Sequence, residues 1–271
     1  RYLRKAFETR GEKDMQTPAF KAFLKENEFW IDEYAQFCAR RDSLEKEYYL
    51  WMQWHLDKQF YAEARYARSK GIALKGDLPI GVSADSAEAY WHPELFNLDS
   101  TAGAPPDYFS RDGQNWGFPT YNWDEMAKDD YAWWKSRLGK MSEYFDAFRI
   151  DHILGFFRIW EIPAGVKSGL LGHFNPALPY SADELRGRGF NPDSQLFVPD
   201  PHREGWYHPR IAAQNTEDYR TLNGYMKDAY NNLYNDFFYH RHNSFWKDCA
   251  MRKLPALLDS TRMLRAVRIW A

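Results

Sequence analysis

The sequence predicts an α/β protein in which helices alternate with short strands. Apolar side chains recur at helical spacing over residues 18–70, and Gly71 follows them, as glycine commonly does at the end of a helix. A short apolar run at 72–74 then predicts a strand. A second helical stretch at 124–144 precedes a second strand candidate at 145–151. Helix, glycine and strand in this order are typical of a βαβ protein.

Charge, cysteine content and hydropathy exclude several functional classes. The 36 basic and 38 acidic residues nearly balance, which argues against a nucleic-acid or membrane-surface partner. Two cysteines cannot build a disulfide framework or a cysteine-rich zinc site. No metalloprotease, Walker or dinucleotide-binding pattern occurs, so we expect no metal and no cofactor. Without a membrane-spanning apolar run or a signal peptide, we expect a cytoplasmic protein.

Aromatic residues are abundant, with 12 Trp, 18 Tyr and 19 Phe. Some of these rings must fill a core, because large rings dominate core burial. The remainder suits a protein that stacks flat apolar faces against a sugar. For any single ring, an ordinary core position is an equally good interpretation.

The candidate strand at 145–151 carries the first candidate site residues. Side chains alternate along a strand, so Arg149 and Asp151 face the same way. Near the C-terminal end of an inward-facing strand, they would lie where barrel enzymes carry out their chemistry. Arg149 would keep Asp151 ionised, as a covalent glycosidase nucleophile requires. A buried ion pair without a catalytic role is the alternative.

Two neighbouring residues are weaker candidates. Asp77 follows Gly76 at the end of the first strand, where its carboxylate could accept sugar hydroxyls. An aspartate after a glycine is also common as a turn or helix cap, which is the better interpretation unless Asp77 and Asp151 open into one cleft. His152 directly follows Asp151, and a lone histidine is more often structural than catalytic.

The loop at 103–119 presents aromatic side chains from a restrained backbone. Its prolines limit the backbone and its glycines allow tight turns. Tyr108 and Trp116 could therefore stack on a pyranose ring and exclude water. The alternative is a compact surface loop that covers its own aromatics.

Three segments together resemble glycoside hydrolase family 77, the amylomaltases or disproportionating enzymes. They are KGDLPIGVSADSAEAYWHPELF at 75–96, GAPPDYFSRDGQNWGFPTYNW at 103–123 and FRIDHILGFFRIWEIPA at 148–164. The resemblance implies a (β/α)8 barrel that transfers α-1,4-glucan segments between maltooligosaccharides with retention of configuration. The long stretch after the third segment is similar to the plant cytosolic form of the family.

The resemblance also implies roles for individual residues. Asp151 stands at the position of the family's nucleophile, and Arg149 at that of its invariant partner. Asp77 matches the aspartate near the donor site, while Tyr108 and Trp116 match an aromatic loop over the acceptor side. We include His152, beside the nucleophile, among the substrate-binding candidates.

A barrel needs roughly 250 residues before insertions, so one with a long insertion would not fit in this chain. We therefore expect a partial (β/α)8 TIM barrel with helical and loop insertions. Residues 1–164 would form part of the catalytic barrel with a helical subdomain and the aromatic loop. Residues 165–219 would be an insertion with little regular structure, and 220–264 a helical return to the barrel.

Residues 265–271 stand where the family's acid/base Glu is due, in a Gly-Glu-Asp-Leu-Gly strand. Suppose that residues 265–271 are encoded by CGT GCG GTG AGG ATC TGG GCN, each a legal codon for the residue present. Shifting this frame by two bases would then give Cys-Gly-Glu-Asp-Leu-Gly. We interpret 265–271 as a frameshifted tail; chance codon degeneracy is the alternative. Retention needs two carboxyl groups, so we expect this chain by itself to be inactive.

Two other functions fit the same residues. An α-amylase-type hydrolase would release glucose and maltose from maltotriose, whereas a transferase would give a ladder of longer oligomers. A non-catalytic glucan-binding protein would use the aromatic rings alone.

Overall fold

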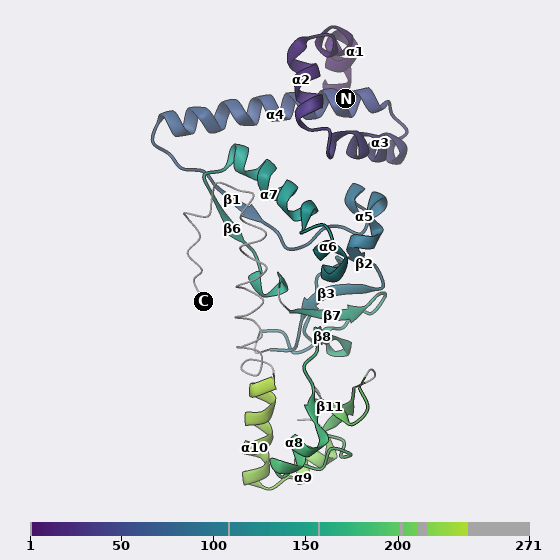
Figure 1. The fold of residues 1–271 in the computed structure, drawn as a ribbon, viewed down its shortest axis with the longest axis vertical. Helices are drawn as coiled ribbons and strands as arrows, with labels where there is room; N and C mark the ends of the chain where they lie inside the picture. The colour runs from purple at the N-terminus through teal and green to yellow at the C-terminus, as the bar shows by residue number, and fades with distance from the viewer. Residues whose placement is uncertain (1, 108, 157, 201–202, 211–215, 238–271) are drawn as a thin grey trace. The chain divides into compact units, whose positions relative to one another are not determined.

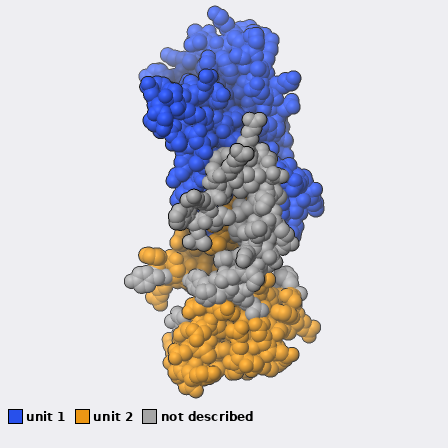
Figure 2. Space-filling view, turned by 60° about the vertical axis from the view of Figure 1, so that its left-hand side comes forward, with its two compact units in different colours: residues 1–98, 121–152, 256–271 blue, residues 99–120, 153–255 orange. Residues whose placement is uncertain are grey.

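The computed structural model describes residues 2–107, 109–156, 158–200, 203–210 and 216–237, which fold into two compact units (Figure 2). The first unit takes the residues up to Leu98 together with Tyr121–His152. The second takes Asp99–Thr120 together with the described residues from Ile153 onward. Each unit has a hydrophobic core of its own.

Four helices open the first unit: α1 (Tyr2–Met15), α2 (Pro18–Glu26), α3 (Ile31–Asp42) and α4 (Lys46–Ser69). The first three pack on the N-terminal half of α4 (Figure 1). Thr17 caps α2 by accepting a hydrogen bond from the Phe20 amide at 3.2 Å. The core between these helices is built from large buried side chains: Phe20, Phe23, Ile31, Tyr49, Leu50, Trp51 and Trp54. The prediction that residues 18–70 are helical is confirmed, and the structure divides them into three helices, α2, α3 and α4.

The glycine predicted to follow this helical stretch does so. Helix α4 ends at Ser69, and Gly71 adopts a φ of +72°, a left-handed conformation that favours glycine. The chain then reaches β1 (Lys75–Leu78). The strand starts after the apolar run at 72–74, so the prediction placed it a few residues early.

Strands β1 and β6 (Ala147–Ile150) form a parallel pair, which Figure 1 shows side by side. In their register Asp77 lies opposite Arg149. Asp146 fixes the start of the pair, because its carboxylate accepts hydrogen bonds from the Leu74 amide at 2.9 Å and from Arg68 Nε at 2.7 Å. A helix precedes each strand, so this part of the predicted βαβ order is confirmed.

The helix before β6 differs from the prediction of one helix at 124–144. It is divided into α6 (Trp123–Ala127) and α7 (Ala132–Tyr144). Asp130 and Tyr131 separate them with φ values of +58° and +60°, outside the helical range. The first unit's other elements within the described ranges are α5 (Ala87–Trp91), η1 (Pro93–Leu95) and β2 (Phe96–Asn97), and β2 pairs with the short β5 (Thr120–Tyr121).

Among its described residues, the second unit contains two small sheets and three helices. The first sheet has the order β4-β3-β7-β8, and the second has the order β10-β11-β9. Their strands are β3 (Ser100–Ala104), β4 (Gln114–Asn115), β7 (Ile159–Pro163), β8 (His173–Asn175), β9 (Tyr180–Ser181), β10 (Phe197–Pro199) and β11 (Trp206–Pro209). The helices are α8 (Ala182–Gly187), α9 (Glu217–Thr221) and α10 (Gly224–Asn235), with single turns η2 (Ile153–Phe156) and η3 (Gly169–Leu171).

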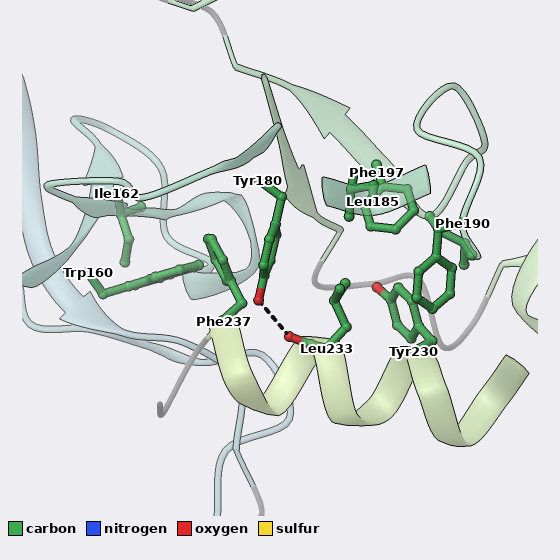
Figure 3. Packing of buried hydrophobic residues seen from close by; sticks show 10 residues of the cluster. Trp160, Ile162, Tyr180, Leu185, Phe190, Phe197, Tyr230, Leu233 and Phe237 are labelled. Carbon is green, nitrogen blue, oxygen red and sulfur yellow. Dashed lines mark hydrogen bonds between the residues drawn. The ribbon is translucent and has the colours of Figure 1, made fainter. Parts of the chain in front are cut away.

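Helix α10 supplies one side of this unit's core. Tyr230, Leu233 and the following Phe237 are buried at a spacing of three and four residues, which places them on one helical face (Figure 3). The single proton of the Tyr180 hydroxyl has two acceptors within reach, the Leu233 carbonyl oxygen at 3.3 Å and the Asp236 carboxylate at 2.8 Å. These contacts join β9 to the helix.

The segment 165–219 was predicted to have little regular structure. Its described residues hold only short elements, the longest being the six residues of α8, yet Tyr180, Leu185 and Phe197 are buried in the common core. The described start of the predicted helical return at 220–264 is α10, while 238–264 and the tail at 265–271 lie outside the described residues. The predicted domain boundaries remain predictions. None of the described helices is long and apolar enough to cross a membrane.

The close approach of Gly76 to Phe145 makes a testable prediction. A Cβ atom at Gly76 would lie 2.6 Å from the Phe145 ring, so Gly76→Ala forces the ring or the strand to move. We expect urea unfolding to show a loss of about 1–3 kcal/mol. Gly139→Ala in α7 is the matched control, because its Cβ meets nothing within 4 Å and should stabilise by roughly 0.5–1 kcal/mol.

Removing the ring should relieve this clash. Adding Phe145→Ala to Gly76→Ala should therefore destabilise by less than the sum of the two single changes. If the losses of stability from the two single changes simply add, the Phe145 ring is not the group that a Cβ atom at Gly76 would meet.

Candidate active site

Three charged side chains meet at the C-terminal ends of β1 and β6. Asp77 is the third residue of β1, and Arg149 is the third residue of β6. The parallel register sets these two directly opposite each other. Asp151 follows one residue after β6, and its amide donates a hydrogen bond to the Leu78 carbonyl oxygen at 3.0 Å. That bond continues the parallel ladder past the last assigned residue of the strand.

Arg149 joins the two carboxylates. Its Nε lies 2.9 Å from one Asp77 oxygen and its terminal nitrogen lies 2.6 Å from the other, a bidentate pair. The same terminal nitrogen lies 3.6 Å from an Asp151 carboxylate oxygen. The sequence predicted Arg149 as the partner of Asp151; in the structure its hydrogen bonds go to Asp77, and Asp151 is the longer contact.

The three side chains are open to solvent, with 54–58% of each side chain exposed. The hydrogen bonds from Arg149 lower the pKa of Asp77, and the positive charge of Lys75 lowers it further. The same pairing raises the pKa of Arg149, so the guanidinium stays charged. An exposed, ordered group of one cation between two carboxylates can bind hydroxyl groups and can present a carboxylate oxygen to an electrophile.

Lys75 is a charged residue of this site that was not among the residues predicted from the sequence. It stands two residues before Asp77 on β1, and side chains two apart share one face of a strand. Period-two alternation along Lys75–Leu78 would have identified it, because Gly76 and Leu78 are buried while Lys75 and Asp77 are exposed. Lys75 therefore adds positive charge on the face that carries Asp77.

His152 leaves the strand in a strained conformation. Its φ is +48°, in the left-handed region that residues other than glycine rarely adopt. Burial lowers the pKa of His152, although the neighbouring Asp151 charge opposes this effect. A neutral imidazole next to Asp151 could donate or accept a hydrogen bond with a ligand.

The aromatic loop belongs to the second unit. Trp116 follows β4, its ring nitrogen donates to Gln114 Oε1 at 3.0 Å, and its ring stacks on Phe118 with centroids 5.8 Å apart. The Asp107 carboxylate accepts hydrogen bonds from the Phe109 and Ser110 amides, and Phe109 is 90% exposed. Tyr108, predicted beside them, lies outside the described residues. Trp116 is thus held by local hydrogen bonding and stacking.

Metal-ligand geometry is not found in the described ranges, where no group of three or more His, Cys, Asp or Glu could hold a metal ion.

A parallel strand pair with carboxylates at its C-terminal ends defines an α/β site of the kind that glycan-processing enzymes use. The model of glycoside hydrolase family 77, described as 4-alpha-glucanotransferase, matches residues 40–264, and the chain belongs to this family. It is 32% identical to the 4-alpha-glucanotransferase DPE2 of Oryza sativa subsp. japonica, with 96% of this chain and 39% of that protein aligned. A 4-alpha-glucanotransferase of Thermus thermophilus is 35% identical, over 64% of this chain and 42% of that one.

Two solved amylomaltase structures are also similar to this chain. The amylomaltase of Streptococcus agalactiae, determined in complex with acarbose, superposes with a TM-score of 0.59 and 30% identity over 78% of this chain and 50% of that chain. The amylomaltase of Corynebacterium glutamicum gives a TM-score of 0.56 at 25% identity, over 63% of this chain and 27% of that chain. The chain spans about two fifths of the length of the two curated relatives named above.

The Arg149–Asp77 contact predicts a selective change in titration. Because Arg149 holds the pKa of Asp77 down, Arg149→Gln should raise it toward the ordinary value of 3.8, as measured by carboxyl 13C NMR. In the wild type, this pairing stabilises the fold above the unfolded-state pKa of Asp77. That stabilisation disappears as the pH falls through the depressed folded-state pKa.

Arg68→Gln is the matched control, since Arg68 chiefly lowers the pKa of Asp146 at the other end of the strand pair. It should raise the pKa of Asp146 and leave that of Asp77 unchanged. Equal effects of both variants on Asp77 would mean that the register-specific contact is not responsible.

Proposed function

We propose that this chain carries the nucleophile side of a 4-α-glucanotransferase site, which moves α-1,4-glucan segments between maltooligosaccharides. We further propose that β1 and β6 are two strands of a (β/α)8 barrel. The parallel pairing, the helix before each strand and the carboxylates at the C-terminal strand ends support this. Family membership and the amylomaltase neighbours point to the same reaction.

The observation that carries the proposal is the joining of Asp77 and Asp151 by Arg149. The sequence alone left Asp77 as a probable turn cap unless it shared a site with Asp151. Asp77 instead binds the same guanidinium that approaches Asp151, so both carboxylates belong to one charged group. If Asp77 and Arg149 formed only a structural ion pair, the approach of the same guanidinium to Asp151 would have no explanation.

In the proposed reaction, an Asp151 oxygen attacks the anomeric carbon of an α-linked glucose. The bond to the leaving sugar oxygen breaks as that oxygen takes a proton from the second carboxyl group that retention requires, a group we do not assign among the described residues. A covalent β-glucosyl ester forms, and a hydroxyl of an acceptor sugar then displaces Asp151 while its proton returns to the second carboxyl group, which restores the α configuration. Arg149 orients the two carboxylates and offsets part of their negative charge. Asp77 accepts hydrogen bonds from sugar hydroxyls, and His152 binds beside the reacting ring.

Transfer rather than hydrolysis requires that an acceptor glucan be bound. We assign this binding to Tyr108 and Trp116 of the aromatic loop, the residues that the resemblance to the family puts on the acceptor side. The stacking of Trp116 on Phe118 and its hydrogen bond to Gln114 support a pre-formed apolar platform. α-1,4-Glucans and maltooligosaccharides would be both donors and acceptors.

A fluoride donor tests the nucleophile directly. Because fluoride leaves without protonation, α-maltotriosyl fluoride should transfer its sugar to Asp151 whether or not a general acid assists. The C–F bond breaks, an ester bond to the carboxylate forms, and mass spectrometry should find one maltotriosyl group on the peptide that contains Asp151.

Asp151→Asn should abolish this label. Asp146→Asn, a carboxylate at the opposite end of the same strand, is the control and should keep it. Labelling that persists in Asp151→Asn, or an unlabelled wild-type protein, would falsify the assignment. Addition of maltose then separates two outcomes: a maltopentaose product indicates transfer, and release of free maltotriose alone indicates hydrolysis.

A further inference from the structure

The backbone that follows β1 is held by two side chains from later in the chain. The Tyr121 hydroxyl donates a hydrogen bond to the Ile80 carbonyl oxygen at 2.6 Å. A terminal nitrogen of Arg137, on α7, donates to the carbonyl oxygen of the preceding residue, Pro79, at 3.3 Å. Two consecutive carbonyl groups are thus bound just beyond the strand that carries Asp77.

Tyr121 is suited to this contact. It is only 6% exposed, and its ring packs against Phe96 and Trp134 with centroids 5.6 Å and 5.2 Å away. Burial raises the pKa of Tyr121, so the hydroxyl remains protonated and able to donate. The ring is fixed on several sides, which leaves the hydroxyl little freedom to follow a moving backbone.

Arg137 is fixed in a similar way. Its guanidinium lies over the rings of Trp133 and Trp134, with the central carbon 5.3 Å and 5.1 Å from their centroids. Contact with these two nearly perpendicular rings holds the guanidinium within reach of the Pro79 carbonyl. Trp134 is fully buried, so the platform that carries Arg137 belongs to the core of the unit.

This attachment matters because β1 is short. Only four residues belong to it, and Leu78 and Ile80 anchor its C-terminal end by burial at 1% and 5% exposure. Asp77 points to the opposite, exposed face, where its contact with Arg149 requires the strand end to stay in register. A bond to the next two carbonyl groups restricts rotation and sliding at this point.

We propose that Tyr121 and Arg137 are positioning residues: by holding the Pro79 and Ile80 carbonyl groups, they keep Asp77 against Arg149, and Arg149 beside Asp151. The inference rests on the proposed function of these carboxylates. Neither residue touches the substrate in this scheme, and both act through the end of β1. Their aromatic surroundings also contribute to folding, so stability alone cannot test the proposal.

Tyr121→Phe tests it with minimal disturbance, because the ring packing remains and only the hydroxyl is lost. We expect the rate of Asp151 labelling by α-maltotriosyl fluoride to fall roughly tenfold to a hundredfold, as for a small misplacement of reacting groups. If the effect passes through Asp77, Tyr121→Phe should slow labelling much less in an Asp77→Asn background. Arg137→Lys, which keeps the charge but loses the planar group, should act in the same direction.

Tyr49→Phe is the matched control. Tyr49 is another buried tyrosine of this unit, 4% exposed, and its hydroxyl donates to Asp42 at 2.6 Å among the N-terminal helices. It should lower the melting temperature about as much as Tyr121→Phe does, without changing the labelling rate. A label rate that is equally unchanged in Tyr121→Phe would overturn the proposal.

A readout independent of labelling separates this inference from the proposed function. Carboxyl 13C titration of Asp77 should show its pKa rising in Tyr121→Phe and in Arg137→Lys, and remaining unchanged in Tyr49→Phe. If the wild-type protein is not labelled, the proposed function fails while the titration still decides the positioning role. If Tyr121→Phe does not fold, the Arg137→Lys titration decides it; an unshifted Asp77 refutes the inference.

Discussion

The bidentate contact between Arg149 and Asp77 is the interaction on which the candidate site depends. It exists because β1 and β6 pair in parallel with these two residues opposite each other. A slip of one residue would turn every side chain of the strand to the other face, so the register that buries Leu78 also presents Asp77. The same guanidinium reaches Asp151, which makes the strand pairing the origin of the whole charged group.

Much of this arrangement could be predicted from sequence, because the signals are local. Alternation along a strand predicted that Arg149 and Asp151 share a face, and the glycine after α4 predicted the end of that helix. The partner of Arg149 could not be predicted, since it depends on pairing with a strand more than seventy residues earlier. Only the register between β1 and β6 shows that Arg149 donates its two hydrogen bonds to Asp77 and makes a longer contact with Asp151.

The sequence-based predictions that differ from the structure have similar physical causes. The helix predicted at 124–144 is interrupted at Asp130 and Tyr131. Both residues adopt left-handed conformations, and no Gly or Pro at this point indicates a break in the helix. Residues 165–219 have a polar composition, yet widely spaced aromatics such as Tyr180 and Phe197 pack on α10 into a core. No short-range periodicity reveals such packing, because Tyr180, Leu185 and Phe197 each come from a different element of two to six residues.

The most direct measurement is a crystal structure of the protein with a maltotriose analogue whose glycosidic oxygen is replaced by sulfur. We predict an Asp151 carboxylate oxygen about 3–3.5 Å from the anomeric carbon. Asp77 should remain bound to Arg149 and should accept a hydrogen bond from a sugar hydroxyl. A sugar bound away from Asp151, or Arg149 turned from Asp77 while the sugar is in place, would contradict the central claim.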